Sequence, residues 1–191
     1  MSATLEITNQ SNRALDAEDW YEVINGERRE VKPMGAYENL LASVLSHLMT
    51  TFATSKRLGL VAVEVLFSLR SEPLLQRKPD VAFVSRSRCR QNRIRRTSAW
   101  DVVPDLAIEF VSATNLADEI EAKLVDYFAT GVRQVWVIYP ETRRVYVHQS
   151  LQTVRGYSED EAIDASPVLP GFTFRLADLF DAIENIDDDT P

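Results

Sequence analysis

Several residue types and segments are scarce or missing in this 191-residue chain, and each absence excludes a class of protein. It has one cysteine, Cys89, so an internal disulfide and a cluster of thiolate metal ligands are both excluded. Its two histidines, His47 and His148, are not spaced as metal ligands. The chain contains no run of about 18 apolar residues, the length that a membrane span needs. Residues 1–19 show no basic segment followed by an apolar stretch, so we expect no secretory signal there. We therefore expect a cytoplasmic protein without a membrane partner.

Two catalytic signatures are also missing. The chain has no glycine-rich phosphate loop and no Gly-x-Ser-x-Gly elbow, which argues against a nucleoside triphosphatase and a serine hydrolase. Hydrophobic residues make up 45% of the chain and charged residues 26%, a composition typical of a folded globular protein. We predict a single domain over residues 1–191, with loosely ordered tails at 1–15 and 185–191.

Charge is distributed unevenly along the chain. The formal net charge is −8, yet residues 157–191 alone carry ten acids and one base. Six arginines lie within residues 85–96: Arg86, Arg88, Arg90, Arg93, Arg95 and Arg96. This run has two interpretations, a solvated loop or a nucleic-acid-binding patch that contacts phosphates.

The pattern of apolar residues predicts an α/β fold. An Asn-Gly pair within residues 21–31 predicts a hairpin, and a stripe at steps of three and four predicts a helix from residue 37 to about 52. Three apolar runs, 60–67, 80–84 and 105–111, predict central strands covered on both faces. A helix over 115–130, a hairpin over 134–148, and a final strand and short helix over 169–183 follow. We predict a mixed central sheet flanked by helices.

Charged residues interrupt these apolar elements. Asp80 follows Pro79 at the start of one strand, Glu109 lies between Ile108 and Phe110, and Glu64 lies within the first run. Burying an unpaired carboxylate costs several kcal/mol. Each has a structural alternative: Asp80 could cap a turn, and Glu64 could face solvent at a sheet edge.

Lys123 is misplaced in a similar way. On a helical wheel it borders the apolar stripe that contains Tyr127 and Leu124, where a lysine ordinarily extends to water. Two acids on adjacent strands suit a hard cation such as Mg²⁺ or Mn²⁺, and a nearby lysine could orient a water molecule. Together these residues suit the metal-dependent hydrolysis of a phosphodiester.

Six segments, in this order and spacing, resemble the Uma-type branch of the PD-(D/E)XK restriction-endonuclease-like superfamily. They are Trp-Tyr-Glu-Val-Ile-Asn-Gly-Glu-Arg-Arg-Glu at 20–30, Lys-Pro-Asp-Val-Ala-Phe-Val at 78–84, Val-Pro-Asp-Leu-Ala-Ile-Glu-Phe-Val-Ser at 103–112, the segment 121–132 around Lys123, Val-Trp-Val-Ile-Tyr-Pro at 135–140, and Leu-Pro-Gly-Phe at 169–172 with 176–180. The resemblance implies a restriction-endonuclease-like mixed sheet flanked by helices, and a Mg²⁺-dependent endonuclease that hydrolyses DNA.

The resemblance also implies site residues. Asp80 and Glu109 would ligate the metal together with the carbonyl of Phe110, and Lys123 would take the place of the lysine that usually stands two residues after the acid, where this chain has Val111. Of two nearby glutamates, Glu30 rather than Glu27 would add a carboxylate near the metal. Because nucleases of this superfamily commonly pair to cut both strands, a homodimer is a further expectation.

Two departures and two rival functions remain open. Many relatives have a histidine where this chain has Tyr37 and an aspartate where it has Tyr139.

Four aromatic residues, Phe110, Phe128, Trp136 and Phe180, are predicted to lie in the core. The rivals are a catalytically idle binding module with a nuclease fold, and a metal-dependent hydrolase of a smaller phosphate ester.

Overall fold

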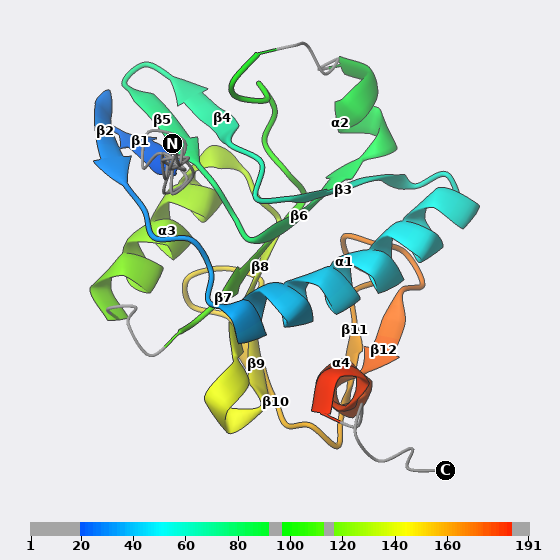
Figure 1. Ribbon diagram of the computed structural model, residues 1–191. Helices are drawn as coiled ribbons and strands as arrows, with labels where there is room; N and C mark the ends of the chain where they lie inside the picture. Colours follow the sequence, from blue (N-terminus) through cyan, green and yellow to red (C-terminus); the bar gives the residue numbers. More distant parts are fainter. Residues whose placement is uncertain (1–19, 92–96, 113–116, 185–191) are drawn as a thin grey trace, which may run out of the picture.

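A six-stranded mixed sheet organises the computed structural model, which describes residues 20–91, 97–112 and 117–184, the first range without the side chains of residues 90 and 91 (Figure 1). The strand order is β10-β9-β8-β7-β6-β3. Its strands are β3 (Gly59–Val63), β6 (Val81–Ser85), β7 (Leu106–Phe110), β8 (Gln134–Tyr139), β9 (Arg144–His148) and β10 (Val154–Tyr157). Only β7 and β8 run parallel; the other neighbours are antiparallel. The predicted mixed sheet is therefore confirmed, while both predicted tails fall outside the described ranges.

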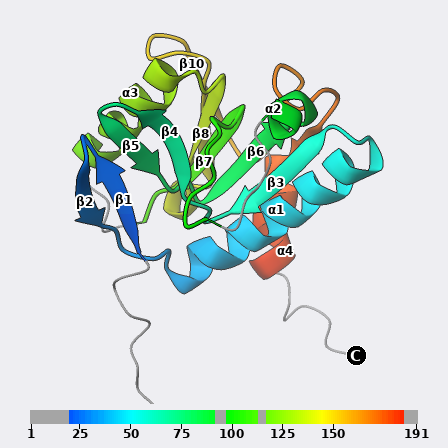
Figure 2. The same cartoon turned by 90° about the horizontal axis from the view of Figure 1, so that it is seen from above.

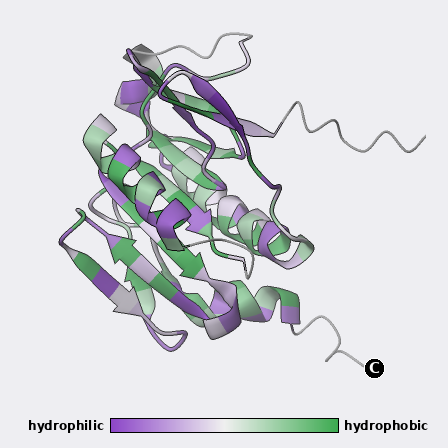
Figure 3. Cartoon of the chain, turned by 90° about the vertical axis from the view of Figure 1, so that its left-hand side faces the viewer, coloured by the Kyte–Doolittle hydropathy of each residue, from purple (hydrophilic) through white to green (hydrophobic). Residues whose placement is uncertain are grey.

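Helices cover both faces of this sheet. Seen from above, α1 (Ala36–Ser55) lies on one side and α3 (Ala117–Thr130) on the other (Figure 2). α1 and α4 (Leu176–Glu184) share one buried apolar cluster with the sheet, to which β11 (Ala162–Asp164) and β12 (Thr173–Arg175) also contribute. α3 belongs to a second cluster on the opposite face. Figure 3 shows hydrophobic residues concentrated along the strands between these helices.

A second, four-stranded sheet adjoins the α3 face, in the order β2-β1-β5-β4. It consists of β1 (Tyr21–Ile24), β2 (Glu27–Glu30), β4 (Phe67–Ser71) and β5 (Leu74–Arg77). Asn25 and Gly26 have φ angles of 53° and 82°, the left-handed conformations that the tight turn between β1 and β2 requires. The predicted hairpin is confirmed.

The apolar run 60–67 is not one central strand. It divides at Glu64, whose φ of 51° turns the chain, so that β3 ends and β4 enters the other sheet. β3 is an edge strand with Leu60 and Val63 exposed, and the expectation of coverage on both faces is wrong for it. The expectation holds for β6 and β7, whose residues are almost all buried.

The remaining elements follow their sequence signals. α2 (Arg86–Gln91) continues directly from β6, and the short 3-10 turn η2 (Pro140–Thr142) joins β8 to β9. Of the predicted core aromatics, Phe110, Trp136 and Phe180 are buried and Phe128 is partly buried. Within the described ranges, no helix has both the length and the apolarity that a membrane span needs.

Candidate active site

The register of β6 and β7 brings the two predicted acids together. Val81 pairs with Ile108 in this antiparallel ladder, so one step further along Asp80 faces Glu109. Directly opposed residues have Cβ atoms about 5 Å apart and project from the same face. Asp80 Oδ2 also accepts a hydrogen bond of 2.6 Å from the backbone N–H of Phe110, which fixes the carboxylate beside the end of β7.

Lys123 and Tyr127 reach the same point from α3. They are four residues apart and therefore share a helix face. Lys123 Nζ lies 2.6 Å from Glu109 Oε2, and the hydroxyl of Tyr127 donates a 2.6 Å hydrogen bond to Glu109 Oε1. Both oxygens of a carboxylate that is 3% exposed are thus bound, one by a cation and one by a hydroxyl. The structure thus brings Asp80, Glu109 and Lys123 together.

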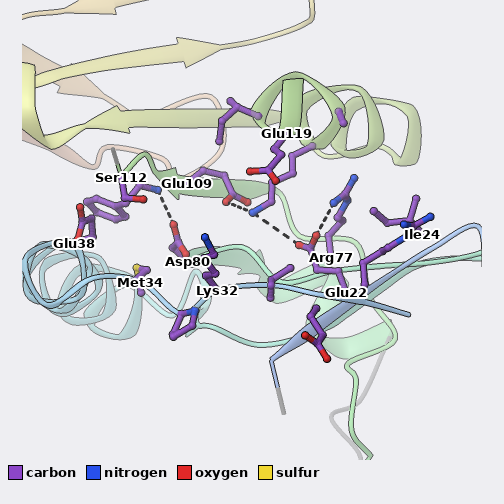
Figure 4. Close-up of a pocket in the computed structure, with 18 of the residues that line it drawn as sticks. Glu22, Ile24, Lys32, Met34, Glu38, Arg77, Asp80, Glu109, Ser112 and Glu119 are labelled. Carbon is purple, nitrogen blue, oxygen red and sulfur yellow. Dashed lines mark hydrogen bonds and ion pairs between the residues drawn. The ribbon is translucent and has the colours of Figure 1, made fainter. Parts of the chain in front are cut away.

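A network of ion pairs continues from Lys123 into the second sheet. Glu22 on β1 is 2% exposed; its Oε1 lies 3.9 Å from Lys123 Nζ and accepts a 3.0 Å hydrogen bond from the backbone N–H of Lys78. Its Oε2 lies 2.5 Å from Arg77 Nη1, and Arg77 also pairs with Asp126 of α3 at 2.5 Å. These ion pairs link β1, β5 and α3 around one site, as Figure 4 shows in part.

Burial and charge shift the proton affinities of these groups. Burial, reinforced by the charge of Glu109, raises the pKa of Asp80 to about 8. Burial likewise raises the pKa of Glu109, although Lys123 and Tyr127 oppose that rise. For Lys123 burial alone would lower the pKa, but the charges of Glu109 and Glu22 outweigh it and the pKa is raised. When both are ionised, Asp80 and Glu109 therefore carry one more negative charge than Lys123 can offset.

Glu22, Arg77, Asp80, Glu109 and Lys123 all line one pocket of about 550 Å³ (Figure 4). Its walls come from β1, β2, the connection from β2 to α1, the first turn of α1, and α3. Seven acids and four bases line it: Glu22, Glu30, Glu38, Asp80, Glu109, Asp118 and Glu119, with Arg29, Lys32, Arg77 and Lys123. The excess of acids means that an anionic substrate needs added positive charge to enter.

The donor set fits a hard divalent cation. Asp80 and Glu109 supply carboxylate oxygens, the ligands that Mg²⁺ and Mn²⁺ prefer, and Phe110 lines the pocket beside them. Among the described residues, no three His, Cys, Asp or Glu side chains form a ready metal cluster. Mg²⁺ does not require one, because it commonly uses one or two carboxylates, waters and substrate phosphates.

The N-terminal glutamate that the sequence favoured, Glu30, lies elsewhere on the pocket. It is exposed on β2, pairs in register with Tyr21 and lines the pocket from that strand. Glu22 is the glutamate in contact with Lys123. Sequence reasoning missed it because Tyr21–Ile24 reads as an ordinary exposed hairpin strand. The available signal was the alternation of the strand: Glu22 lies on the same face as the apolar Ile24, which indicates a face turned toward the interior.

The described part of the predicted arginine patch, α2 with Arg86 and Arg88, lies away from the pocket. α2 begins at the far end of β6 from Asp80, roughly 15 Å along the strand. Arg88 donates hydrogen bonds to the carbonyls of Val103, Pro104 and Gly131, and its Nε lies 3.4 Å from Asp105. Arg88 therefore secures α2 to its neighbours and is not a free phosphate ligand. Arg86 is exposed, whereas Arg93, Arg95, Arg96 and the side chain of Arg90 lie outside the described residues.

The two positions that depart from the family's pattern, and Glu64, do not line the pocket. Tyr37 donates a 2.6 Å hydrogen bond to Glu184 of α4, and the ring of Tyr139 contacts that of Tyr146 edge to face. Glu64 is partly buried at the break between β3 and β4, and its N–H bonds the carbonyl of Asp80.

Comparisons with known proteins agree with this fold. A family model described as "Putative restriction endonuclease", Uma2, matches residues 9–177. A crystal structure titled as a putative nuclease belonging to DUF820 from Anabaena variabilis ATCC 29413 is similar, with a TM-score of 0.73 and 16% identity; the match covers 85% of this chain and 90% of that one. No curated protein matches. This chain has a restriction-endonuclease-like fold and belongs to the Uma2 family.

Proposed function

We propose that the protein is a divalent-metal-dependent endonuclease that hydrolyses phosphodiester bonds of DNA. The observation that carries the proposal is the convergence of Asp80, Glu109 and Lys123 in the lining of one pocket. The family and the fold support a nuclease-like function for this pocket.

The roles of the residues follow from their contacts. Asp80 and Glu109 would hold the cation, with Phe110 at its side; Tyr127 fixes the orientation of Glu109. When bound, the cation supplies the charge that polarises a phosphate and lowers the pKa of water. Lys123 carries its proton firmly, so it acts as a hydrogen-bond donor that orients water or a phosphate oxygen, not as a general base.

Plasmid cleavage tests the proposal. The wild-type protein, incubated with plasmid and Mg²⁺ or Mn²⁺, is expected to nick or linearise it. Asp80→Asn, which keeps the acceptor for the Phe110 N–H, should abolish cleavage and lower Mn²⁺ uptake in titration calorimetry. Lys56→Ala, at the distant C-terminus of α1, serves as the control that should leave both unchanged. Equal cleavage by wild type and Asp80→Asn would refute the proposed site.

One observation favours a second candidate, a hydrolase of smaller phosphate esters. The part of the arginine-rich segment that the structure describes lies away from the pocket, and the pocket itself carries more acids than bases. A long polyanion binds such a surface poorly. Hydrolysis of bis(p-nitrophenyl) phosphate without any plasmid cleavage would favour this candidate over the endonuclease.

A further inference from the structure

Three of the four bases that line the pocket are already engaged with acids. Arg29 lies 2.7 Å from Glu27, Arg77 pairs with Glu22 and Asp126, and Lys123 pairs with Glu109. Drawing Lys123 away from Glu109 would leave a buried carboxylate without its cation, which costs several kcal/mol. Arg77 and Lys123 therefore cannot leave their acids without that cost, whereas Arg29 pairs with Glu27 at the exposed surface, where an ion pair contributes little.

Lys32 differs from them. It is exposed on the connection between β2 and α1, and among the described residues it makes no ion pair or hydrogen bond through its side chain. Figure 4 shows its side chain directed into the pocket that Asp80 and Glu109 also line. An unpaired ammonium in a pocket with an excess of acids is available to a substrate anion.

The backbone holds Lys32 at this position. The preceding residue, Val31, donates a 3.0 Å hydrogen bond to the carbonyl of Trp20, and the following residue is Pro33. A residue before proline is restricted to extended conformations. Lys32 thus projects from a constrained segment at the pocket wall, and ordering its side chain is the main entropic cost of a contact.

We propose that Lys32 binds a phosphate group of the substrate in this pocket, which makes it a substrate-binding residue distinct from Lys123. The inference rests on the proposed function for the identity of the substrate. Its physical basis is that Lys32 supplies positive charge without breaking an existing ion pair. The same contact would serve a DNA phosphate or a smaller phosphate ester.

The salt dependence of DNA binding tests this assignment. Binding of a fluorescein-labelled duplex oligonucleotide is measured by polarisation in Ca²⁺ over a series of salt concentrations, for wild type, Lys32→Ala, Lys32→Arg and the control Lys56→Ala. Lys32→Ala should weaken binding about tenfold at low salt and reduce the slope of log K against log salt by about 0.9. Lys32→Arg should recover most of the loss, and Lys56→Ala should match wild type.

Each outcome is decisive. If Lys32→Ala retains the affinity and slope of wild type, the assignment is overturned while plasmid cleavage by wild type still supports the nuclease. If wild type binds DNA but cleaves neither plasmid nor oligonucleotide with Mn²⁺, the proposed function fails, and the change in slope still decides Lys32. If wild type binds no duplex, the endonuclease is overturned, and an unchanged KM of Lys32→Ala for bis(p-nitrophenyl) phosphate would then overturn the Lys32 assignment as well.

Discussion

Asp80→Asn should stabilise the metal-free protein in a pH-dependent way. Folding raises the pKa of this carboxyl from 3.8 to about 8, chiefly through burial and then through the charge of Glu109. Between these two values the folded state holds a proton that the unfolded state has released. The wild-type protein therefore loses stability as pH rises from about 4 to about 8. Asparagine does not ionise and is free of this loss.

The size of the effect follows from the two pKa values. Between about pH 5 and pH 8.5 the advantage of Asp80→Asn over wild type should grow by on the order of 4 kcal/mol. Partial exposure of the carboxyl and rearrangement around it would reduce that figure, so it is an upper bound. The measurement is urea unfolding in EDTA, followed by tryptophan fluorescence, at both pH values.

Asp105→Asn is the matched control. Asp105 is also a buried aspartate, but its Oδ2 accepts a 2.7 Å hydrogen bond from Ser85, and Arg88 and Arg133 lie 3.4 and 3.6 Å from its Oδ1. Removing its charge should destabilise the protein at both pH values, because those arginines lose their acid. A difference between Asp80→Asn and wild type that stays constant from pH 5 to pH 8.5 would refute the reasoning.

Three further predictions concern the buried ion pairs and hydrogen bonds of the site. Lys123→Met should destabilise the protein by about 3–5 kcal/mol in urea unfolding, because a buried carboxylate loses its cation, and the double variant with Glu109→Gln should recover much of that loss. Tyr127→Phe should cost about 1.5–3 kcal/mol and weaken Mn²⁺ uptake about tenfold in calorimetry, whereas Tyr146→Phe should do neither. Arg77→Met should lower the free energy of unfolding by about 3–5 kcal/mol, and adding Glu22→Gln should restore part of that loss. Strictly additive losses would contradict the network of ion pairs.

The local elements could be predicted from sequence because their signals are local. An Asn-Gly pair requires a tight turn, a stripe at steps of three and four requires a helix, and Asp80 and Glu109 are conspicuous inside apolar strands. The four-stranded sheet was not predicted. Its strands β4 and β5 are short and mixed in character, and the run 60–67 conceals the turn at Glu64 that separates β3 from β4.

The sequence by itself determined which residues carry charge into apolar elements, and hence that Asp80, Glu109 and Lys123 were candidates. The tertiary structure alone decided which groups surround them. Glu22 is 87 positions from Glu109 in the sequence, and Lys32 is 48 positions from Asp80, yet all four line the same pocket. They do so because β1 pairs with β5, which places Glu22 beside Lys123 of α3. Proximity of that kind depends on long-range packing of separate elements, which no local pattern of residues records.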